Sequence, residues 1–165
     1  LMQILAGEDE PDEGTVKWGV STSRSYFPKD NSKYFDGCEL NLVDWLRQYS
    51  AAGFETQNES YIRGFLGRML FSGDDVFKQV NVLSGGEKVR CMLSRMMLYG
   101  SNVLILDQPT NHLDLSAIRW LENFLMDFEN TVIVVSHDRH FLNKVCTHIC
   151  DVDFGKIQLL SLIHI

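Results

Sequence analysis

Four residues at the start of a helical segment have the types and spacing of a phosphate-binding turn. Ser84, Gly85, Gly86 and Glu87 precede residues with helical spacing. Glycines let successive backbone N–H groups converge, and the start of a helix carries partial positive charge, so this turn can hold an anion. The same residues also fit an ordinary capping box, because a serine is followed three positions later by a glutamate. These residues alone leave both interpretations open.

Asp107 is a candidate Mg²⁺ ligand because it directly follows the apolar run Val103–Leu106. A short apolar run of this kind predicts a buried strand. Ligands of open α/β sheets bind at the carboxyl ends of the strands. A carboxylate at that place can hold Mg²⁺, and the ion in turn bridges the phosphates of a nucleotide. The alternative is an aspartate that only caps the turn after the strand.

Gln108 occupies the next position, where a catalytic acid would be expected. An amide can orient water but has no useful basicity, and loss of a general base typically lowers a rate by about 10²–10⁴. The alternative is a surface glutamine on which hydrolysis never depended.

Two further residues are candidate site residues because each lies next to a predicted strand or helix. His137 comes after the second apolar run, residues 131–136, and could bond a γ-phosphate or orient water. A single histidine after a strand is otherwise a structural residue. Asp114 precedes another helical segment and is a candidate N-cap, which alone could explain it.

Strands that alternate with helices must position these residues. Segments 103–107 and 131–136 are continuous apolar runs, and residues 115–128 between them have helical periodicity. This alternation indicates an α/β fold with a parallel sheet covered on both faces. The same patterns predict further helices at residues 1–6, 40–50, 61–71, 86–99 and 138–145, and further strands at residues 15–20, 25–27, 148–153 and 156–160.

The helical segments in the middle of the chain interrupt this α/β pattern. We therefore expect an α/β core of residues 1–37 and 101–160, with a helical subdomain at about residues 38–100. The first helix has no N-terminal cap, which suggests the end of a longer helix. Residues 161–165 follow a strand pattern without turn residues and are a candidate non-native tail.

Composition restricts the class of protein. The chain has 165 residues, enough for one domain, and its 45% hydrophobic content is typical of a globular protein. The net charge of −7 argues against a general nucleic-acid clamp, which needs a basic face. No apolar run approaches the roughly 20 residues of a membrane span. We expect the four cysteines to be free thiols in a reducing cytosol.

The order of four motifs resembles the nucleotide-binding domain of ATP-binding cassette (ABC) proteins. LSGGE resembles the signature motif, VLILD the Walker B strand, the LD of NHLD the D-loop, and VSHD the loop with the switch histidine. This resemblance implies a P-loop NTPase-like α/β fold with a helical subdomain, ATP hydrolysis, and ATP and Mg²⁺ as cofactors. It implies ATP contacts from Ser84, Gly85, Gly86, Glu87 and Asp114, Mg²⁺ binding by Asp107, and catalytic positions at Gln108 and His137.

The chain departs from the family pattern at Gln108, at Lys29 and in residues 161–165, which do not continue the pattern, and it also lacks one segment of the family. It contains no G-x-x-x-x-G-K-[ST], the Walker A segment that LMQILAG directly follows in the family, so we expect a domain that lacks this phosphate loop. Gln108 stands where the family has glutamate, a substitution that slows hydrolysis. Lys29 stands at the place of the Q-loop glutamine, which leaves open whether that loop contacts Mg²⁺ and water.

The form DxPTNHLD, together with SHDRHFL, resembles most closely the ABC-F subfamily. Proteins of this subfamily have two cassettes in one chain and no membrane domain, and they are implicated in ribosome binding and translation. The resemblance therefore implies a cytoplasmic protein, a second cassette as partner, and ribosome or RNA contacts through regions outside this chain. Whether the chain is a first cassette, a second cassette or a join of both stays open.

Three functions remain open from the sequence. The first is part of an ATP-hydrolysing cassette that regulates translation on the ribosome, with this chain inactive alone. The second is the ATPase subunit of an ABC membrane transporter. The third is a non-hydrolysing, ATP-dependent binding module, which Gln108 and the missing phosphate loop favour.

Overall fold

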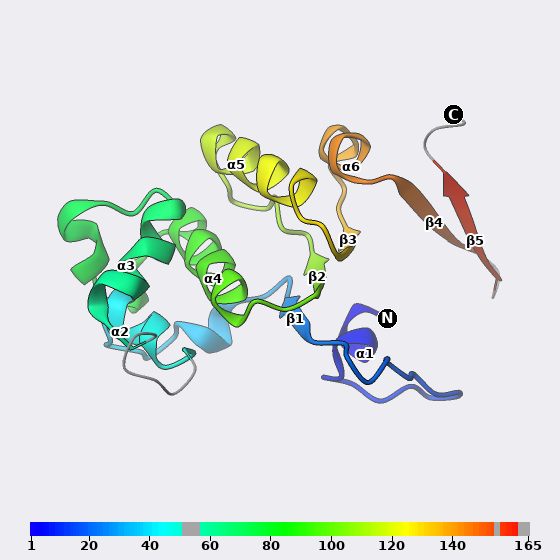
Figure 1. Cartoon of the computed structure of the whole chain (residues 1–165), viewed down its shortest axis with the longest axis horizontal. Coiled ribbons are helices and arrows are strands. Elements are labelled where there is room, and N and C mark those ends of the chain that lie inside the picture. Colours follow the sequence, from blue (N-terminus) through cyan, green and yellow to red (C-terminus); the bar gives the residue numbers. More distant parts are fainter. Residues whose placement is uncertain (51–56, 154–155, 162–165) are drawn as a thin grey trace.

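The computed structural model describes residues 1–50, 57–153 and 156–161 of the chain. Helices and strands alternate over much of its length (Figure 1). The helices are α1 (Met2–Ala6), α2 (Leu42–Arg47), α3 (Glu59–Arg68), α4 (Gly85–Tyr99), α5 (Leu115–Met126) and α6 (Arg139–Val145). The strands are β1 (Arg24–Phe27), β2 (Val103–Asp107), β3 (Thr131–Val135), β4 (His148–Asp153) and β5 (Lys156–Ser161).

The centre of the fold is a three-stranded parallel sheet in the order β1–β2–β3. Phe27, the last residue of β1, lies beside Leu106 of β2. Asp107, the last residue of β2, lies beside Val135, the last residue of β3. The carboxyl ends of all three strands therefore meet at one edge of the sheet, where ligands of α/β folds bind.

Both faces of the central strand are covered, as the sequence predicts. Val103 and Ile105 belong to a small cluster with Met2 of α1. Leu104 and Leu106 face the opposite side and belong to the main core, which takes in residues of α2 to α6. The continuous apolar run of β2 thus reflects burial on two faces and not on one.

Helices α2, α3 and α4 pack together, and α4 also contacts β1. Trp45 of α2 is completely buried there, stacked on Phe35 at 5.1 Å, and its indole N–H donates to the backbone oxygen of Tyr34 at 2.9 Å. Figure 1 shows these three helices grouped beside the sheet. They lie within the segment predicted as a helical subdomain, whose boundaries stay a prediction.

Strands β4 and β5 form a separate antiparallel pair, which in Figure 1 extends away from the parallel sheet. Val152, Ile157 and Leu159 of this pair are exposed. Strand β5 includes Ser161, opposite His148, so it runs one residue beyond the predicted strand. The rest of the candidate tail, residues 162–165, lies outside the described residues.

The predicted strand at residues 15–20 is wrong, because these residues have no strand assignment in the structure. Val16 and Val20 are exposed, whereas the indole N–H of Trp18 donates to the backbone oxygen of Leu5 at 3.1 Å. The alternating apolar residues therefore do not mark one face of a sheet. Instead, the hydrogen bond from Trp18 holds this segment against α1.

The helix predicted at residues 61–71 forms but lies earlier in the sequence. Its N-cap is Asn58, whose side-chain oxygen accepts from the backbone N–H of Ser60 at 2.8 Å. It ends at Arg68, because Leu70 has φ +64°, a left-handed conformation that a right-handed helix cannot contain. Helix α2 is shorter than its predicted range by a few residues at each end.

All four cysteines are free in the structure, and Cys91 is fully buried. Burial raises the pKa of the Cys91 thiol well above its ordinary value. Among the residues that the structure describes, no helix combines the length and the apolar character that crossing a membrane requires.

Candidate functional site

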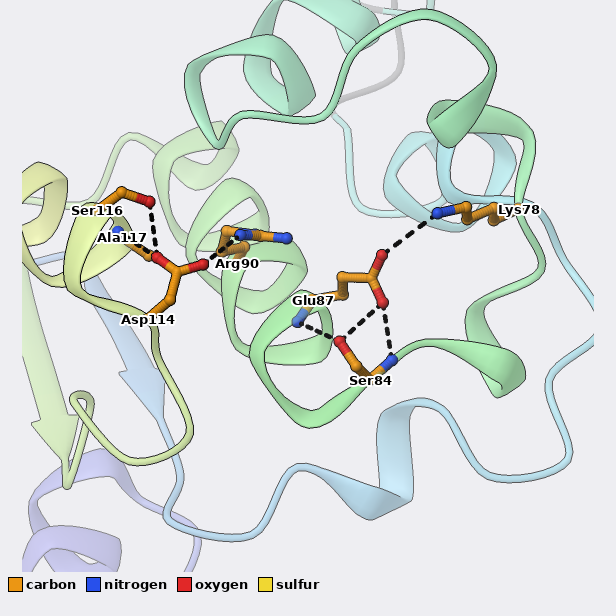
Figure 2. A network of polar contacts seen from close by, with 7 residues as sticks. All are labelled: Lys78, Ser84, Glu87, Arg90, Asp114, Ser116 and Ala117. Atoms are coloured by element: carbon orange, nitrogen blue, oxygen red, sulfur yellow. Dashed lines mark hydrogen bonds and ion pairs between the residues drawn. The ribbon is translucent and has the colours of Figure 1, made fainter.

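The serine–glycine turn at the start of α4 forms the predicted capping box (Figure 2). The Ser84 hydroxyl oxygen accepts from the backbone N–H of Glu87 at 3.4 Å. One carboxylate oxygen of Glu87 accepts from the backbone N–H and from the hydroxyl of Ser84, both at 2.8 Å. The other lies 3.5 Å from Nζ of Lys78. The backbone N–H groups of Gly85 and Gly86 lie in the first turn, where no helical acceptor exists for them, so they are suited to an anion.

The charge of Glu87 is stabilised by this arrangement. Burial alone would raise the pKa of the Glu87 carboxyl. The hydrogen bonds from the backbone and hydroxyl of Ser84, together with the charge of Lys78, outweigh burial and lower the pKa below its ordinary value. The start of α4 is therefore held by an ionised side chain at neutral pH.

Asp114 is the N-cap of α5, as predicted, and it also forms an ion pair with α4. Its Oδ1 accepts from the backbone N–H of Ala117 at 2.8 Å and from the hydroxyl of Ser116 at 2.7 Å. Its Oδ2 lies 3.2 Å from Nη1 of Arg90 (Figure 2). The hydrogen bonds from Ser116 and Ala117, and to a smaller extent the charge of Arg90, lower the pKa of the Asp114 carboxyl.

The loop between β2 and α5 packs directly on the glycine turn. A Cβ placed on Gly86 would lie only 2.8 Å from the backbone oxygen of His112, and one on Gly85 would lie 3.4 Å from the His112 Cβ. His112 itself has φ +64°, a conformation that is uncommon for residues other than glycine. Gly86 is therefore required by the close approach of this loop.

Asp107 lies at the carboxyl edge of the sheet and is partly buried. In the described part of the chain, its carboxylate makes no hydrogen bond or ion pair, so its oxygens remain available to a cation. Carboxylate oxygen is a ligand that Mg²⁺ prefers. The position and chemistry of this side chain fit the predicted metal ligand.

Gln108 is not a surface residue. Only 5% of it is exposed, and its φ of +54° turns the chain sharply after β2. Its backbone N–H donates to the backbone oxygen of Val135 at 2.8 Å. Its side-chain oxygen accepts from the backbone N–H of His137 at 3.1 Å. The glutamine amide therefore joins the ends of β2 and β3.

His137 is exposed, so its ring can reach a ligand at this edge. The loop around it is held by two further contacts. The hydroxyls of Thr110 and Ser136 are 3.3 Å apart, and Asp138 caps α6 by accepting from the backbone N–H of Phe141 at 3.0 Å. The structure thus places Asp107, Gln108 and His137 at one edge of the sheet, and their roles there stay a prediction.

Lys29 follows β1 by two residues, so it lies beyond the carboxyl end of that strand. Its side chain is exposed and makes no hydrogen bond or ion pair within the described residues. Its assignment to the Q-loop position stays a prediction.

The sequence patterns did not single out His112 and Arg90. His112 lies within the NHLD run, but its contact with Gly86 depends on two segments that are distant in sequence. Arg90 lies one helical turn after Gly86, and this i, i+4 spacing from a required glycine is the signal that could have identified it.

Replacing Gly86 with alanine should destabilise the chain by about 1–3 kcal/mol, because the new methyl group would collide with the His112 oxygen. The matched control is Gly64→Ala in α3, where nothing lies within 4 Å of the new Cβ. That change should stabilise the chain by about 0.5–1 kcal/mol. Chemical denaturation monitored by circular dichroism measures both. Equal changes in the free energy of unfolding for the two substitutions would contradict the close approach of Gly86 and the His112 oxygen.

Comparison with known proteins identifies the family of this chain. The family model described as "ABC transporter" matches residues 1–111. The chain is 59% identical, over 92% of its length, to the uncharacterized ABC transporter ATP-binding protein YkpA of Bacillus subtilis. It is 34% identical, over 98% of its length, to the energy-dependent translational throttle protein EttA of Escherichia coli. The chain spans 28–29% of the length of these two relatives.

The fold agrees with a solved structure. An ATP-binding cassette in a dimeric, post-hydrolysis state bound to ADP and phosphate matches with a TM-score of 0.72 at 18% identity, covering 98% of this chain and 78% of that one. At this identity the match supports the α/β cassette fold alone. Together with the family model, which covers most of the chain, it leads to one conclusion. The chain belongs to the ABC family, as a segment of an ATP-binding domain whose relatives are of the ABC-F type.

Proposed function

We propose that this chain is part of an ATP-binding cassette that binds and hydrolyses ATP within a longer ABC-F protein. The observation that carries this proposal is the carboxyl edge of the sheet, where the Gln108 amide joins the Asp107 strand to the His137 loop. An available carboxylate beside an exposed imidazole suits a metal-bound triphosphate. Because the chain belongs to the ABC family, the expected ligand is ATP.

The residues of the edge have distinct roles in this proposal. Asp107 would hold Mg²⁺, which when bound neutralises phosphate charge. The His137 ring would contact the γ-phosphate. Gln108 would orient water, but an amide cannot take up the proton that the water loses. A glutamine at position 108 would therefore make hydrolysis in the intact protein slow.

The start of α4 would serve a different nucleotide. In a pair of cassettes, Ser84, Gly85, Gly86 and Glu87, with Asp114, would complete the ATP site of the facing cassette. The N–H groups of Gly85 and Gly86 and the helix dipole of α4 supply the positive potential that a phosphate needs. The second cassette would belong to the same protein, since the chain spans less than a third of its relatives.

The wider role would be regulation of translation on the ribosome by a cytoplasmic protein without a membrane partner. The name of EttA, a translational throttle, supports this role. Because the net charge of this chain is −7, ribosome or RNA contacts would come from regions outside it. The domain division at about residues 38–100 would place the Ser84–Glu87 turn in the helical subdomain, and Asp107 and Asp114 in the α/β core.

Two other functions have specific support. YkpA carries the name of a transporter ATP-binding protein, which favours an ATPase subunit of an ABC transporter. Gln108 favours a module that binds ATP without hydrolysing it. A membrane permease that co-purifies with the natural protein would support the first of these alternatives.

Gln108→Glu in the full-length natural protein should raise ATP turnover, by as much as about 10²–10⁴, because a carboxylate can act as general base where the amide cannot. Phosphate release at saturating Mg²⁺-ATP measures the rate. The control is Gln158→Glu, which adds the same charge at an exposed position of β5. An unchanged rate in Gln108→Glu would show that position 108 does not limit hydrolysis.

The 165-residue chain by itself should bind ATP only weakly and release no phosphate, because its sequence contains no G-x-x-x-x-G-K-[ST] to cradle the phosphates. Calorimetric titration with Mg²⁺-ATP, alongside the full-length protein, measures the difference. Micromolar affinity of the chain alone would contradict this expectation.

A further inference from the structure

Two contacts fasten one face of α4 to the loop between β2 and α5. Gly86 leaves room for the backbone oxygen of His112, and Arg90 pairs with Asp114 at 3.2 Å. Gly86 and Arg90 are four residues apart in α4, so they lie on the same face, one turn from each other. Their partners are two residues apart in the loop. This attachment at two points resists both sliding and rotation of the helix against the loop.

Arg90 is a suitable anchor because burial and a ring contact already restrict its side chain. Its side chain is 18% exposed, whereas that of Asp114 is 58% exposed. The guanidinium lies over the ring of Phe71, 5.3 Å from the centroid, which restricts the side chain before any pairing. Less conformational freedom is lost when such a side chain forms an ion pair.

The two carboxylate oxygens of Asp114 have different partners. Oδ1 fixes the first turn of α5 through Ser116 and Ala117, and Oδ2 faces Arg90 (Figure 2). A movement of α4 would therefore act directly on the start of α5.

The other end of the same loop carries the strand-edge residues. Asp107 ends β2, Gln108 begins the loop, and the Gln108 side-chain oxygen accepts from the backbone N–H of His137. Thr110 within the loop adds its contact to Ser136. A series of contacts thus connects the glycine turn, the loop and Ser136, the residue that follows β3.

The geometry points to Arg90 as a positioning residue that makes the glycine turn of α4 and the Asp107–Asp114 loop move as one unit. In the proposed function, on which this inference rests, the glycine turn and Asp114 serve one ATP molecule, whereas Asp107 and Gln108 at the start of the loop serve another. Arg90 would then transmit the state of one nucleotide site to the other within a single cassette. A merely structural arginine would stabilise the fold without linking the two segments.

Hydrogen–deuterium exchange on the full-length natural protein tests this inference without depending on hydrolysis. Without nucleotide, Arg90→Gln should speed exchange about two- to fivefold in both segments, residues 84–90 and 108–114, the size expected for loss of one partly exposed ion pair. Asp114→Asn keeps an N-cap side chain but removes the charge, and should have the same effect on residues 84–90. The double variant should be no worse than either single variant.

Arg119→Gln is the control, since it removes the same charge from an exposed position of α5. It should leave both segments unchanged. Arg90→Lys should restore part of the protection, because it keeps the charge but not the planar group. Faster exchange confined to residues 84–90 in Arg90→Gln, or additive effects in the double variant, would overturn the inference.

A second arm adds Mg²⁺-ATP and separates this inference from the proposed function. In the wild-type protein, ATP should slow exchange in both segments, and in Arg90→Gln the protection of the two segments should differ. If ATP protects neither segment of the wild type, the proposed function fails, while the nucleotide-free arm still decides the role of Arg90. If ATP protects both segments equally in wild type and Arg90→Gln, coupling through Arg90 is refuted.

Discussion

Strand β2 is hydrogen-bonded on both sides, to β1 and to β3, and the position of the candidate site follows from this pairing. Because all three strands run in parallel, the pairing of Asp107 with Val135 brings the chain after β2 and the chain after β3 to one edge. Burial of Leu104 and Ile105 on opposite faces holds β2 in register, since a slip of one residue would exchange its two faces. The side chains of Asp107 and Gln108 therefore cannot leave this edge while the sheet is intact.

The loop between β2 and α5 connects this edge to α4 of the helical part. Residues 108–114 begin with the left-handed turn at Gln108, pass over Gly86 at His112, and end at the Asp114 cap of α5. Two left-handed residues other than glycine in one short loop indicate a backbone held by its surroundings. Figure 2 shows Ser84, Glu87 and Arg90 on neighbouring turns of α4, with Asp114 facing Arg90 from the start of α5. The candidate phosphate-binding and metal-binding residues thus lie on elements that contact each other.

Local patterns predicted the elements of the site well, and tertiary contacts explain what they missed. The apolar run of β2 and the capping residues Ser84 and Asp114 were correctly predicted, because burial and capping depend on neighbours in sequence. The strand predicted at residues 15–20 failed, since alternation alone does not supply a partner strand. The burial of Gln108, and its bond to His137, depend on a segment 29 residues away. The contact of Gly86 with His112 likewise joins distant segments, so local patterns could not show that this glycine is needed for packing.

The central claim is that the carboxyl edge of the parallel sheet binds the metal–nucleotide complex. Methyl NMR of the full-length protein with Mn²⁺-ATP in place of Mg²⁺-ATP tests it directly, because the paramagnetic ion broadens only signals close to it. Methyl groups of Leu106 and Val135 lie at the ends of β2 and β3, whereas those of Leu66 lie in α3. If the complex binds at this edge, the Leu106 and Val135 signals should broaden strongly and those of Leu66 should change little. Unchanged Leu106 and Val135 signals, with broadening at Leu66, would contradict it.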